Sequence, residues 1–245
     1  MMLELQNITL SFPGVFAPVL SNINFSLKRG EFCVVIGPNG SGKSSLMKIV
    51  SGEYQPTSGE VLCSGAISQV GQDTNKGTVS SMTLLENIAL SQMQHKAPKL
   101  QFYKRHEKDI LSKIASLKMG LEDYLHQPIE TLSGGQRQII ATLMAMTSGG
   151  ELLLLDEHTS ALDPKMQAKL MEYTSQSISE LGLSSLMITH KMDDAIRYGD
   201  RLIMLSQGKI VFDVSGESKA KLKTQELIAL FHKHEDLGFQ SKGAS

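Results

Sequence analysis

The spacing of apolar and polar residues in the first part of the chain predicts three strands followed by a helix. Apolar side chains roughly alternate with polar ones over 3–10 and 20–27, as in half-buried strands, whereas 32–36 is apolar throughout, as in a buried strand. Ser11-Phe12-Pro13-Gly14 breaks the first pattern. The first two strands predict a small antiparallel sheet beside the core, and the spacing of Leu46, Ile49 and Val50 predicts a helix over 43–50.

The middle of the chain changes from strand-like to helix-like spacing. After a loop over 53–59, short strand-like pieces occur at 60–63 and 66–70. From about residue 83 onward, apolar residues recur at helical spacing, and the span 74–148 is therefore predicted to be a mainly helical insertion. The residues that carry this pattern are Leu84, Leu85, Ile88, Ala89, Ile110, Leu111, Ile114 and Leu117.

The last hundred residues return to alternating strands and helices. We expect a buried strand over 151–156, a helix over 165–181, strands over 183–189 and 201–205, and a hairpin partner over 209–214. The apolar side of the long helix should carry Leu170, Tyr173, Ile178 and Leu181. A short amphipathic helix is predicted near 224–231, and the polar end, 240–245, is expected to be disordered. Strands alternating with helices predict an α/β fold with a mainly parallel sheet.

Composition narrows the class of protein. The 245 residues carry a formal net charge of −1, which argues against a general nucleic-acid binder. The longest apolar runs, 32–36 and 152–155, are far shorter than the roughly 20 residues of a membrane span, and the N-terminus does not resemble a signal peptide. Cys33 and Cys63 lie in apolar strand-like stretches and are predicted to be buried free thiols. These features predict a cytoplasmic protein.

A glycine-rich motif follows the buried strand 32–36. Residues 37–44 fit the phosphate-binding pattern G-x-x-x-x-G-K-[ST] between a predicted strand and a predicted helix. Its members are Gly37, Pro38, Asn39, Gly40, Ser41, Gly42, Lys43 and Ser44. Glycines let the backbone approach phosphate oxygens closely, and the loop amides and helix N-terminus attract an anion. Lys43 adds a charge at the β- and γ-phosphates, and the Ser44 hydroxyl suits Mg²⁺.

Two carboxylates end the buried strand 151–156. Parallel strands present their carboxyl ends to nucleotides, so Asp156 is placed to contribute to the Mg²⁺ shell. Glu157, one residue further, could reach a water molecule aligned with the γ-phosphate. The pair would be weak evidence alone, but it becomes strong evidence of nucleoside triphosphate hydrolysis when a phosphate loop precedes it.

The stretch Leu132-Ser133-Gly134-Gly135-Gln136 completes a recognisable set of motifs. By itself, Ser-Gly-Gly at a helix start is an anion-binding terminus with a good N-cap. Together with the phosphate loop (Walker A), Gln72, the Asp-Glu pair, 160–163 and His190, it resembles the ATPase subunit of ABC transporters over about 3–214. The resemblance implies a P-loop core of mainly parallel sheet, an N-terminal antiparallel subdomain, and a helical subdomain over about 74–148 that carries the signature.

The resemblance also implies which residues act on ATP and Mg²⁺. Catalytic roles fall to Glu157, His190, Lys43 and Gln72, and Mg²⁺ contacts to Ser44, Gln72 and Asp156. Phe12 lies where the family stacks an aromatic ring on adenine, with Phe16 as the alternative. Gln72 also lies where the helical subdomain hinges. The remaining nucleotide contacts are Gly37, Pro38, Asn39, Gly40, Ser41, Gly42, Lys43, Ser44, Ser45, Ser133, Gly134, Gly135 and Gln136.

The same resemblance implies partners and a location. Ser133, Gly134 and Gly135 would hold the γ-phosphate of ATP bound to a second copy, so the active unit should be a head-to-tail dimer with Asp163 at its interface. The other partners would be an integral membrane permease and, indirectly, a solute-binding protein, with no nucleic acid. The cassette should cover 1–232, with a polar tail over 233–245, and lie on the inner face of the cell membrane.

Each assigned residue also has a simpler interpretation. Phe12 could be a core residue, Gln72 a surface loop residue, and His190 a buried histidine with a structural role. Asp163-Pro164 could be only a helix N-cap with proline at the first helical position. At the level of the whole protein, the alternatives are a soluble ABC ATPase in assembly or repair, and a nucleotide sensor that does not hydrolyse.

The chain departs from the usual family pattern at three places. His158 follows Glu157 where proline is usual, 140–146 lacks the usual Arg-Ala-Leu, and the loop 147–150 lacks its usual proline. None of these changes removes a catalytic group. They suggest a side branch of importer-type ATPases. The run 156–164, together with Gly-Glu-Ser-Lys at 216–219, resembles importers that use a binding protein for small molecules such as aromatic amino acids.

Overall fold

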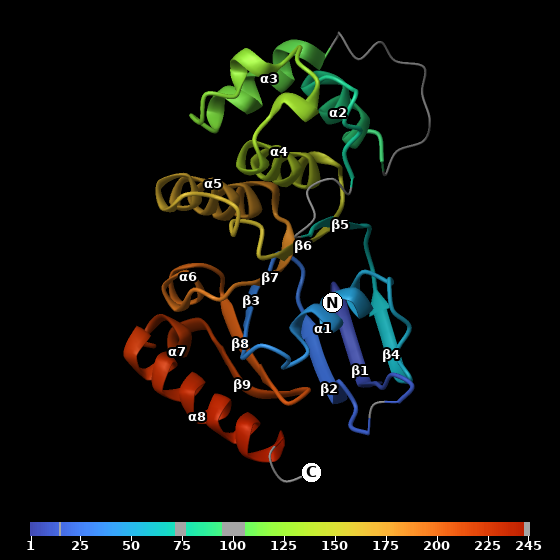
Figure 1. Ribbon diagram of the computed structural model, residues 1–245, viewed down its shortest axis with the longest axis vertical. Helices are drawn as coiled ribbons and strands as arrows, with labels where there is room; N and C mark the ends of the chain where they lie inside the picture. The colour runs from blue at the N-terminus through green and yellow to red at the C-terminus, as the bar shows by residue number, and fades with distance from the viewer. Residues whose placement is uncertain (15, 72–76, 95–105, 243–245) are drawn as a thin grey trace. The chain divides into compact units, whose positions relative to one another are not determined.

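The computed structural model describes residues 1–14, 16–71, 77–94 and 106–242 (Figure 1). The chain forms two compact units. The first combines Met1–Gly65 with Gly182–Ser245, and the second is Ala66–Leu181. The first unit therefore contains the two ends of the sequence, and the second is an uninterrupted segment between them.

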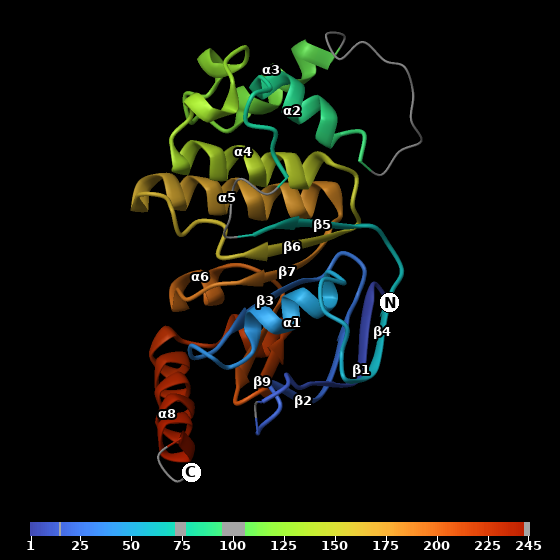
Figure 2. The same ribbon diagram turned by 45° about the vertical axis from the view of Figure 1, so that its right-hand side comes forward.

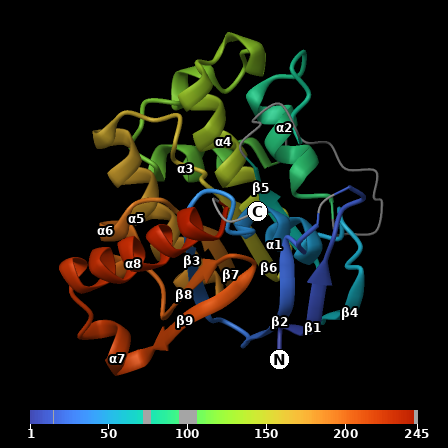
Figure 3. The same cartoon turned by 60° about the horizontal axis from the view of Figure 1, so that its bottom comes forward.

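The first unit contains a three-stranded antiparallel sheet (Figure 3). Strand β1 (Leu3–Leu10) lies between β2 (Leu20–Leu27) and β4 (Ser58–Cys63). The predicted antiparallel sheet is thus confirmed, although its third strand follows the phosphate loop in sequence. Gly59, in β4, has a φ of 97°, and a Cβ there would clash with backbone atoms of β1.

The first unit also contains the buried parallel strands that the apolar runs predicted. Strand β3 (Phe32–Ile36) pairs in parallel with both β7 (Ser184–Ile188) and β8 (Arg201–Ser206), and β9 (Lys209–Ser215) forms an antiparallel hairpin with β8. Every residue of β3 and β7 is buried. Burial on both faces explains why β3 is apolar throughout instead of alternating. The predicted α/β class is confirmed.

Helices also accompany these strands in the first unit. They are α1 (Lys43–Val50), α6 (Met192–Arg197), α7 (Gly216–Ala220) and α8 (Thr224–Lys242). Helix α8 contacts α6 and β8, and Figure 2 shows it below α6. It continues past the predicted end near Phe231, so the prediction of disorder is wrong for 240–242. No proline interrupts the segment, and the His232 ring lies 3.6 Å from the Glu235 carboxylate one turn further on.

In its described residues, the second unit combines four helices with a short parallel strand pair. Strand β5 (Ile67–Val70) pairs with β6 (Leu152–Asp156). The helices are α2 (Leu84–Ser91), α3 (Glu107–Ser116), α4 (Gly134–Thr147) and α5 (Pro164–Leu181), with 3₁₀ turns at Glu122–Tyr124 and Ile129–Thr131. One hydrophobic cluster joins α2, α3, α4 and Leu170 of α5. The helical spacing read from the sequence therefore corresponds to side chains of this core, except at Leu111, which is 38% exposed.

Two burial predictions are wrong. Cys63 is exposed because β4 is an edge strand of its sheet and buries little of its surface. Leu181 is 55% exposed because it is the last residue of α5, beyond the contacts that bury Leu170. Cys33, in contrast, is a buried free thiol as predicted, and burial raises its pKa.

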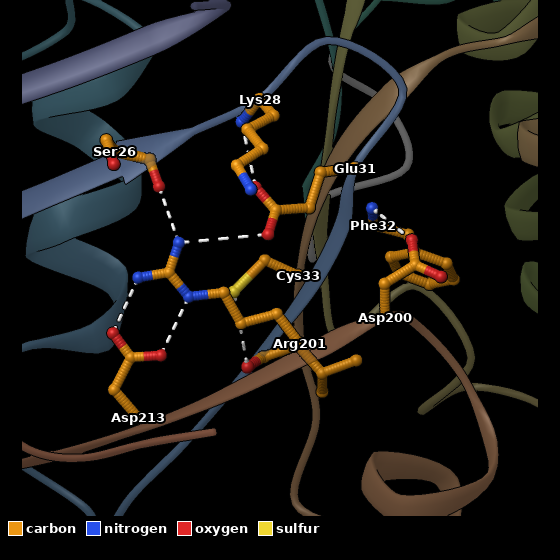
Figure 4. A network of polar contacts seen from close by, with 9 residues as sticks. Ser26, Lys28, Glu31, Phe32, Cys33, Asp200, Arg201 and Asp213 are labelled. Atoms are coloured by element: carbon orange, nitrogen blue, oxygen red, sulfur yellow. Dashed lines mark hydrogen bonds and ion pairs between the residues drawn. The ribbon is translucent and has the colours of Figure 1, made fainter. Parts of the chain in front are cut away.

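Arg201 on β8 connects β9, β2 and the residue before β3, at the end of β3 away from the phosphate loop (Figure 4). Its guanidinium donates two hydrogen bonds to Asp213 on β9 and one, of 2.7 Å, to the carbonyl of Ser26 on β2. Glu31, just before β3, lies 3.8 Å away, and the guanidinium carbon lies 5.0 Å from the centre of the Phe25 ring. Opposite charge, hydrogen bonds and a cation–π contact together stabilise this end of the sheet.

Candidate functional site

The phosphate loop connects β3 to α1 in a backbone shape that requires glycine. Gly37 and Gly42 have φ values of 152° and 104°. A Cβ on Gly37 would overlap the carbonyl oxygen of Leu205, and one on Gly42 would lie 2.7 Å from Leu20 Cδ2. Helix α1 begins with Gly42 as its N-cap, no capping side chain and no acidic residue in its first turn. Its positive N-terminal end is therefore not neutralised by its own first turn.

The polar groups of the loop match the chemistry of a polyphosphate. Lys43 is 6% exposed, and its Nζ donates to the carbonyl oxygens of Gly37 at 2.8 Å and Pro38 at 3.0 Å. These bonds hold the ammonium over the loop. The Ser41 hydroxyl is buried and has no hydrogen-bond partner within the described ranges. A buried hydroxyl of this kind is costly unless a ligand oxygen satisfies it.

His190 lies at the same sheet edge as the loop. Val35 of β3 pairs with Ile188 of β7 in a parallel register, so the residues after both strands emerge side by side. The Thr189 amide donates to the Val35 carbonyl at 3.3 Å, and the exposed His190 follows directly. Strand register thus places His190 at the same edge of the sheet as the phosphate loop, and its catalytic role remains a prediction. The alternative of a buried structural histidine does not fit its exposure.

In the second unit, Asp156 and Glu157 are partly exposed at the carboxyl end of β6. Glu157 has a φ of 51°, in the left-handed region that few non-glycine residues adopt. Its carbonyl accepts a 3.0 Å hydrogen bond from the Ser160 amide, which closes a turn directly after the strand. The tight turn therefore gives Glu157 a backbone conformation different from that of a residue in a continued strand.

His158 follows Glu157 and is 1% exposed. Its Nε2 has no hydrogen-bond partner within the described residues, and burial lowers its pKa from 6.5 to about 4. The imidazole is therefore neutral at physiological pH. The departure from the family's usual proline places a side chain in the protein interior beside the proposed catalytic carboxylate.

The buried His158 should make stability depend on pH. Because its folded-state pKa of about 4 lies below the ordinary 6.5, the unfolded chain binds more protons between these values. The stability that neutral His158 contributes is therefore complete above pH 6.5 and is lost as pH falls toward 4. The wild type should lose about 2 kcal/mol of unfolding free energy between about pH 7.5 and 5 because of this histidine, and His158→Leu should not show that loss. Urea unfolding of both proteins at the two pH values measures the difference. Equal pH slopes for the two proteins would contradict this prediction.

The signature stretch forms the capped start of α4. The Ser133 hydroxyl accepts from the Gln136 amide at 3.2 Å, and the Gln136 side chain accepts from the Ser133 amide at 2.9 Å, which is a capping box. Leu132 is buried in the core, whereas Ser133 and Gly134 are exposed. The helix N-terminus is thus rigidly held and accessible. Gln136, predicted to contact nucleotide, has a structural role as the second half of this cap.

The segment 160–163 lies beside the start of α4 in the same unit. A Cβ on Gly135 would lie 2.9 Å from Leu162 Cδ2, so glycine permits this close approach. Asp163 Oδ1 accepts from the amides of Lys165 and Met166 at 3.0 and 3.1 Å, and Pro164 is the first residue of α5. The N-cap interpretation of Asp163-Pro164 is confirmed; a role at a dimer interface remains a prediction.

The two candidate aromatic residues differ in their surroundings. Phe12 is 37% exposed and contacts Tyr54 edge to face, with ring centres 5.6 Å apart, whereas Phe16 is fully exposed. Phe12 is therefore supported by protein on one side and open on another. Sequence reasoning missed Tyr54, although its position just after α1 could have suggested contact with the phosphate-loop helix. Gln72 lies outside the described residues.

The candidate residues belong to both units. The first unit holds Phe12, the phosphate loop and His190, and the second holds Asp156-Glu157 and the signature stretch. Within the described ranges no helix is both long and apolar enough to cross a membrane. The same part of the chain contains no group of three or more His, Cys, Asp or Glu side chains placed to hold a metal ion.

Comparison with known proteins connects these features to one family. A family model described as ABC transporter matches residues 20–160. The tyrosine transport ATP-binding protein of Clostridioides difficile is 35% identical over 247 residues, covering 94% of this chain and 98% of that protein. The spermidine/putrescine import ATP-binding protein PotA of Mycoplasma mycoides is 33% identical over 214 residues. That match covers 85% of this chain and 60% of PotA.

A solved structure agrees with the sequence comparison. A dimeric ATP-binding cassette in a post-hydrolysis state, bound to ADP and phosphate, has a TM-score of 0.77 and 27% sequence identity. The match covers 87% of this chain and 98% of that cassette. The fold, the phosphate loop and the similarity across nearly the whole sequence agree. The chain therefore belongs to the ABC transporter family, as an importer-type ATP-binding subunit that hydrolyses ATP to power transport.

Proposed function

We propose that this subunit powers the import of a small solute, an aromatic amino acid such as tyrosine. Similarity to a tyrosine transport ATP-binding protein along 94% of the chain carries this proposal. The subunit would bind an integral membrane permease on the cytoplasmic face of the cell membrane, and the permease would receive cargo from a solute-binding protein. The cargo would contact those partners and not this chain.

Two copies would act as a head-to-tail dimer with two ATP molecules between them. The related cassette is dimeric, and the start of α4 is an accessible helix N-terminus without an acidic residue in its first turn. Ser133, Gly134 and Gly135 of one copy would contact the γ-phosphate bound to the phosphate loop of the other. ATP would then hold the dimer closed, and hydrolysis would release it.

Hydrolysis would proceed by in-line attack of water on the γ-phosphate. Positioning and electrostatic stabilisation supply most of the rate in such reactions. Lys43 and the loop amides would neutralise charge that develops on the phosphate oxygens, Glu157 would orient or deprotonate the water, and His190 would hold that geometry. The turn that starts at Glu157, anchored by buried His158, suits a carboxylate that must keep one direction.

Magnesium would be held by oxygen ligands, which this ion prefers. The Ser44 hydroxyl at the start of α1 and the Asp156 carboxylate at the end of β6 are donors of that type. Gln72 would add an amide oxygen. The ion would reduce the negative charge of the β- and γ-phosphates.

The base would be held by Phe12. The ring is partly exposed and supported by Tyr54, as expected for a surface that stacks against a purine. Phe16, which is fully exposed, is the alternative.

Gln72 would also be the hinge through which closing of the dimer reaches the permease.

Purification from membranes tests the transporter assignment. We expect tagged protein extracted with detergent to bring an integral membrane protein with it, and ATP hydrolysis by that complex to rise with a tyrosine-loaded binding protein. A Lys43→Ala variant, which removes the ammonium held over the phosphate loop, should keep the partner but not the hydrolysis. Purification without any integral membrane protein would favour a soluble ABC ATPase.

A further inference from the structure

Three side chains form a cluster beside the phosphate-loop helix. Lys48 lies in the last turn of α1, and its Nζ is 4.8 Å from the centre of the Tyr54 ring and 3.3 Å from the Tyr54 hydroxyl. Tyr54 in turn meets Phe12 edge to face, with ring centres 5.6 Å apart and planes at 79°. The cluster therefore runs from the Lys48 ammonium on α1, through the partly buried Tyr54 ring, to the exposed Phe12 ring on its loop.

Backbone bonds hold the two loops of this cluster together. The Tyr54 amide donates to the Lys48 carbonyl at 3.0 Å, which fixes Tyr54 to the end of α1. Three residues later, the Thr57 amide donates to the Thr9 carbonyl at 2.8 Å, and the Thr57 hydroxyl accepts from the Ser11 amide at 2.9 Å. The Phe12 loop is thus attached to the segment that follows the phosphate-loop helix.

The arrangement orders a ring that would otherwise change rotamer freely. An exposed phenylalanine on a loop loses side-chain entropy when it stacks on a ligand, and this loss weakens binding. Contact with Tyr54 restricts the Phe12 ring before the ligand arrives. Tyr54 is itself held from the other side, because Lys48 contacts both its ring face and its hydroxyl. Each ring is therefore positioned by the group behind it.

We propose that Tyr54, held by Lys48, is a positioning residue that sets the Phe12 ring for a purine base. The inference rests on the proposed role of Phe12 in adenine stacking and adds to it the residue that orients the ring. It would link base recognition to α1, whose N-terminus follows the phosphate loop. Tyr54 acts through Phe12 and is not itself the stacking surface, because its partly buried ring already contacts Lys48 and Phe12.

The test compares ATP with inorganic tripolyphosphate, which lacks the base. Phe12→Ala should weaken ATP binding about tenfold or more, as expected for a lost base–aromatic stack. Tyr54→Leu should weaken ATP binding about threefold to tenfold, the range for an aromatic pair, and raise KM with little change in kcat. Tripolyphosphate affinity should be unchanged in both. Tyr54→Phe, which keeps the ring, should lie between Tyr54→Leu and the wild type.

Two controls separate positioning from general loss of structure. Tyr124→Leu, a half-buried tyrosine that packs in the second unit, should leave both affinities unchanged. The Phe12→Ala/Tyr54→Leu double variant should bind ATP no more weakly than Phe12→Ala alone, because Tyr54 acts only through Phe12.

Three results would overturn the inference. Wild-type ATP affinity in Tyr54→Leu, with weakened binding in Phe12→Ala, would remove the role of Tyr54 and leave that of Phe12. Unchanged ATP affinity in Phe12→Ala would show that Phe12 does not stack on adenine, and the positioning role of Tyr54 would then fall with it. Equal weakening of ATP and tripolyphosphate by Tyr54→Leu would show a purely structural effect on α1. None of these results bears on whether the subunit powers a transporter.

Discussion

Glu157→Gln is expected to bind ATP with nearly wild-type affinity but to hydrolyse it about 10²- to 10⁴-fold more slowly, the usual range for losing a general base. Glutamine has almost the same shape and can still occupy the turn after β6, so the fold should persist. It cannot accept a proton from water or carry the negative charge that orients it. Because ATP is then not consumed, the ATP-bound dimer should accumulate and be visible by size-exclusion chromatography with ATP and Mg²⁺.

Glu151→Gln provides the matched control. Glu151 is exposed, directly before the other end of β6, and the change in charge is identical. It should hydrolyse ATP at the wild-type rate and elute with the wild type. Brisk hydrolysis by Glu157→Gln would remove the role assigned to Glu157, and loss of ATP binding would show that the variant disturbs the fold.

Two inactive variants are expected to restore activity when mixed, if each ATP site is built from two copies. Lys43→Ala removes the loop cation, and Gly134→Glu places a carboxylate where the γ-phosphate should contact the signature. A Cβ at Gly134 meets no atom within 4 Å, and an acidic residue in the first turn of α4 should favour the helix. Each variant alone should lose about 10²-fold or more in turnover, as when an electrostatic contact to the transition state is removed.

In an equal mixture, half of the dimers contain one copy of each variant. Such a dimer pairs the intact phosphate loop of Gly134→Glu with the intact signature of Lys43→Ala. About a quarter of all sites are then complete, so roughly a quarter of wild-type turnover should return if the sites act independently. Lys43→Ala mixed with the Lys43→Ala/Gly134→Glu double variant contains no intact loop and should stay inactive. If the first mixture shows no recovery, the composite site is contradicted.

Local sequence determined the elements that bind phosphate. The apolar run 32–36, the glycines at 37 and 42, and Lys43 predict a strand, loop and helix without any distant contact, and the structure has all three. The reason is that backbone conformation, helix dipole and loop hydrogen bonds involve residues near one another in sequence. The capping boxes at Thr83 and Ser133 and the N-cap at Asp163 are local in the same way.

Tertiary structure decided burial and the contacts between distant segments. Cys63 lies in an apolar stretch and is nevertheless exposed, because strand order makes β4 an edge. His158 is polar and nevertheless buried, and its neighbour Glu157 takes a left-handed φ of 51° that no spacing pattern shows. The contact of Phe12 with Tyr54 joins residues 42 positions apart.

The sequence by itself thus identified the phosphate loop, the paired carboxylates and the signature, because each is a short run of residues whose chemistry depends on its immediate neighbours. It could not reveal which side chain supports Phe12 or where His158 lies. Those features depend on strand order and on packing between segments far apart in the chain. Only the folded chain brings Lys48, Tyr54 and Phe12 into one cluster beside the helix that begins at Lys43.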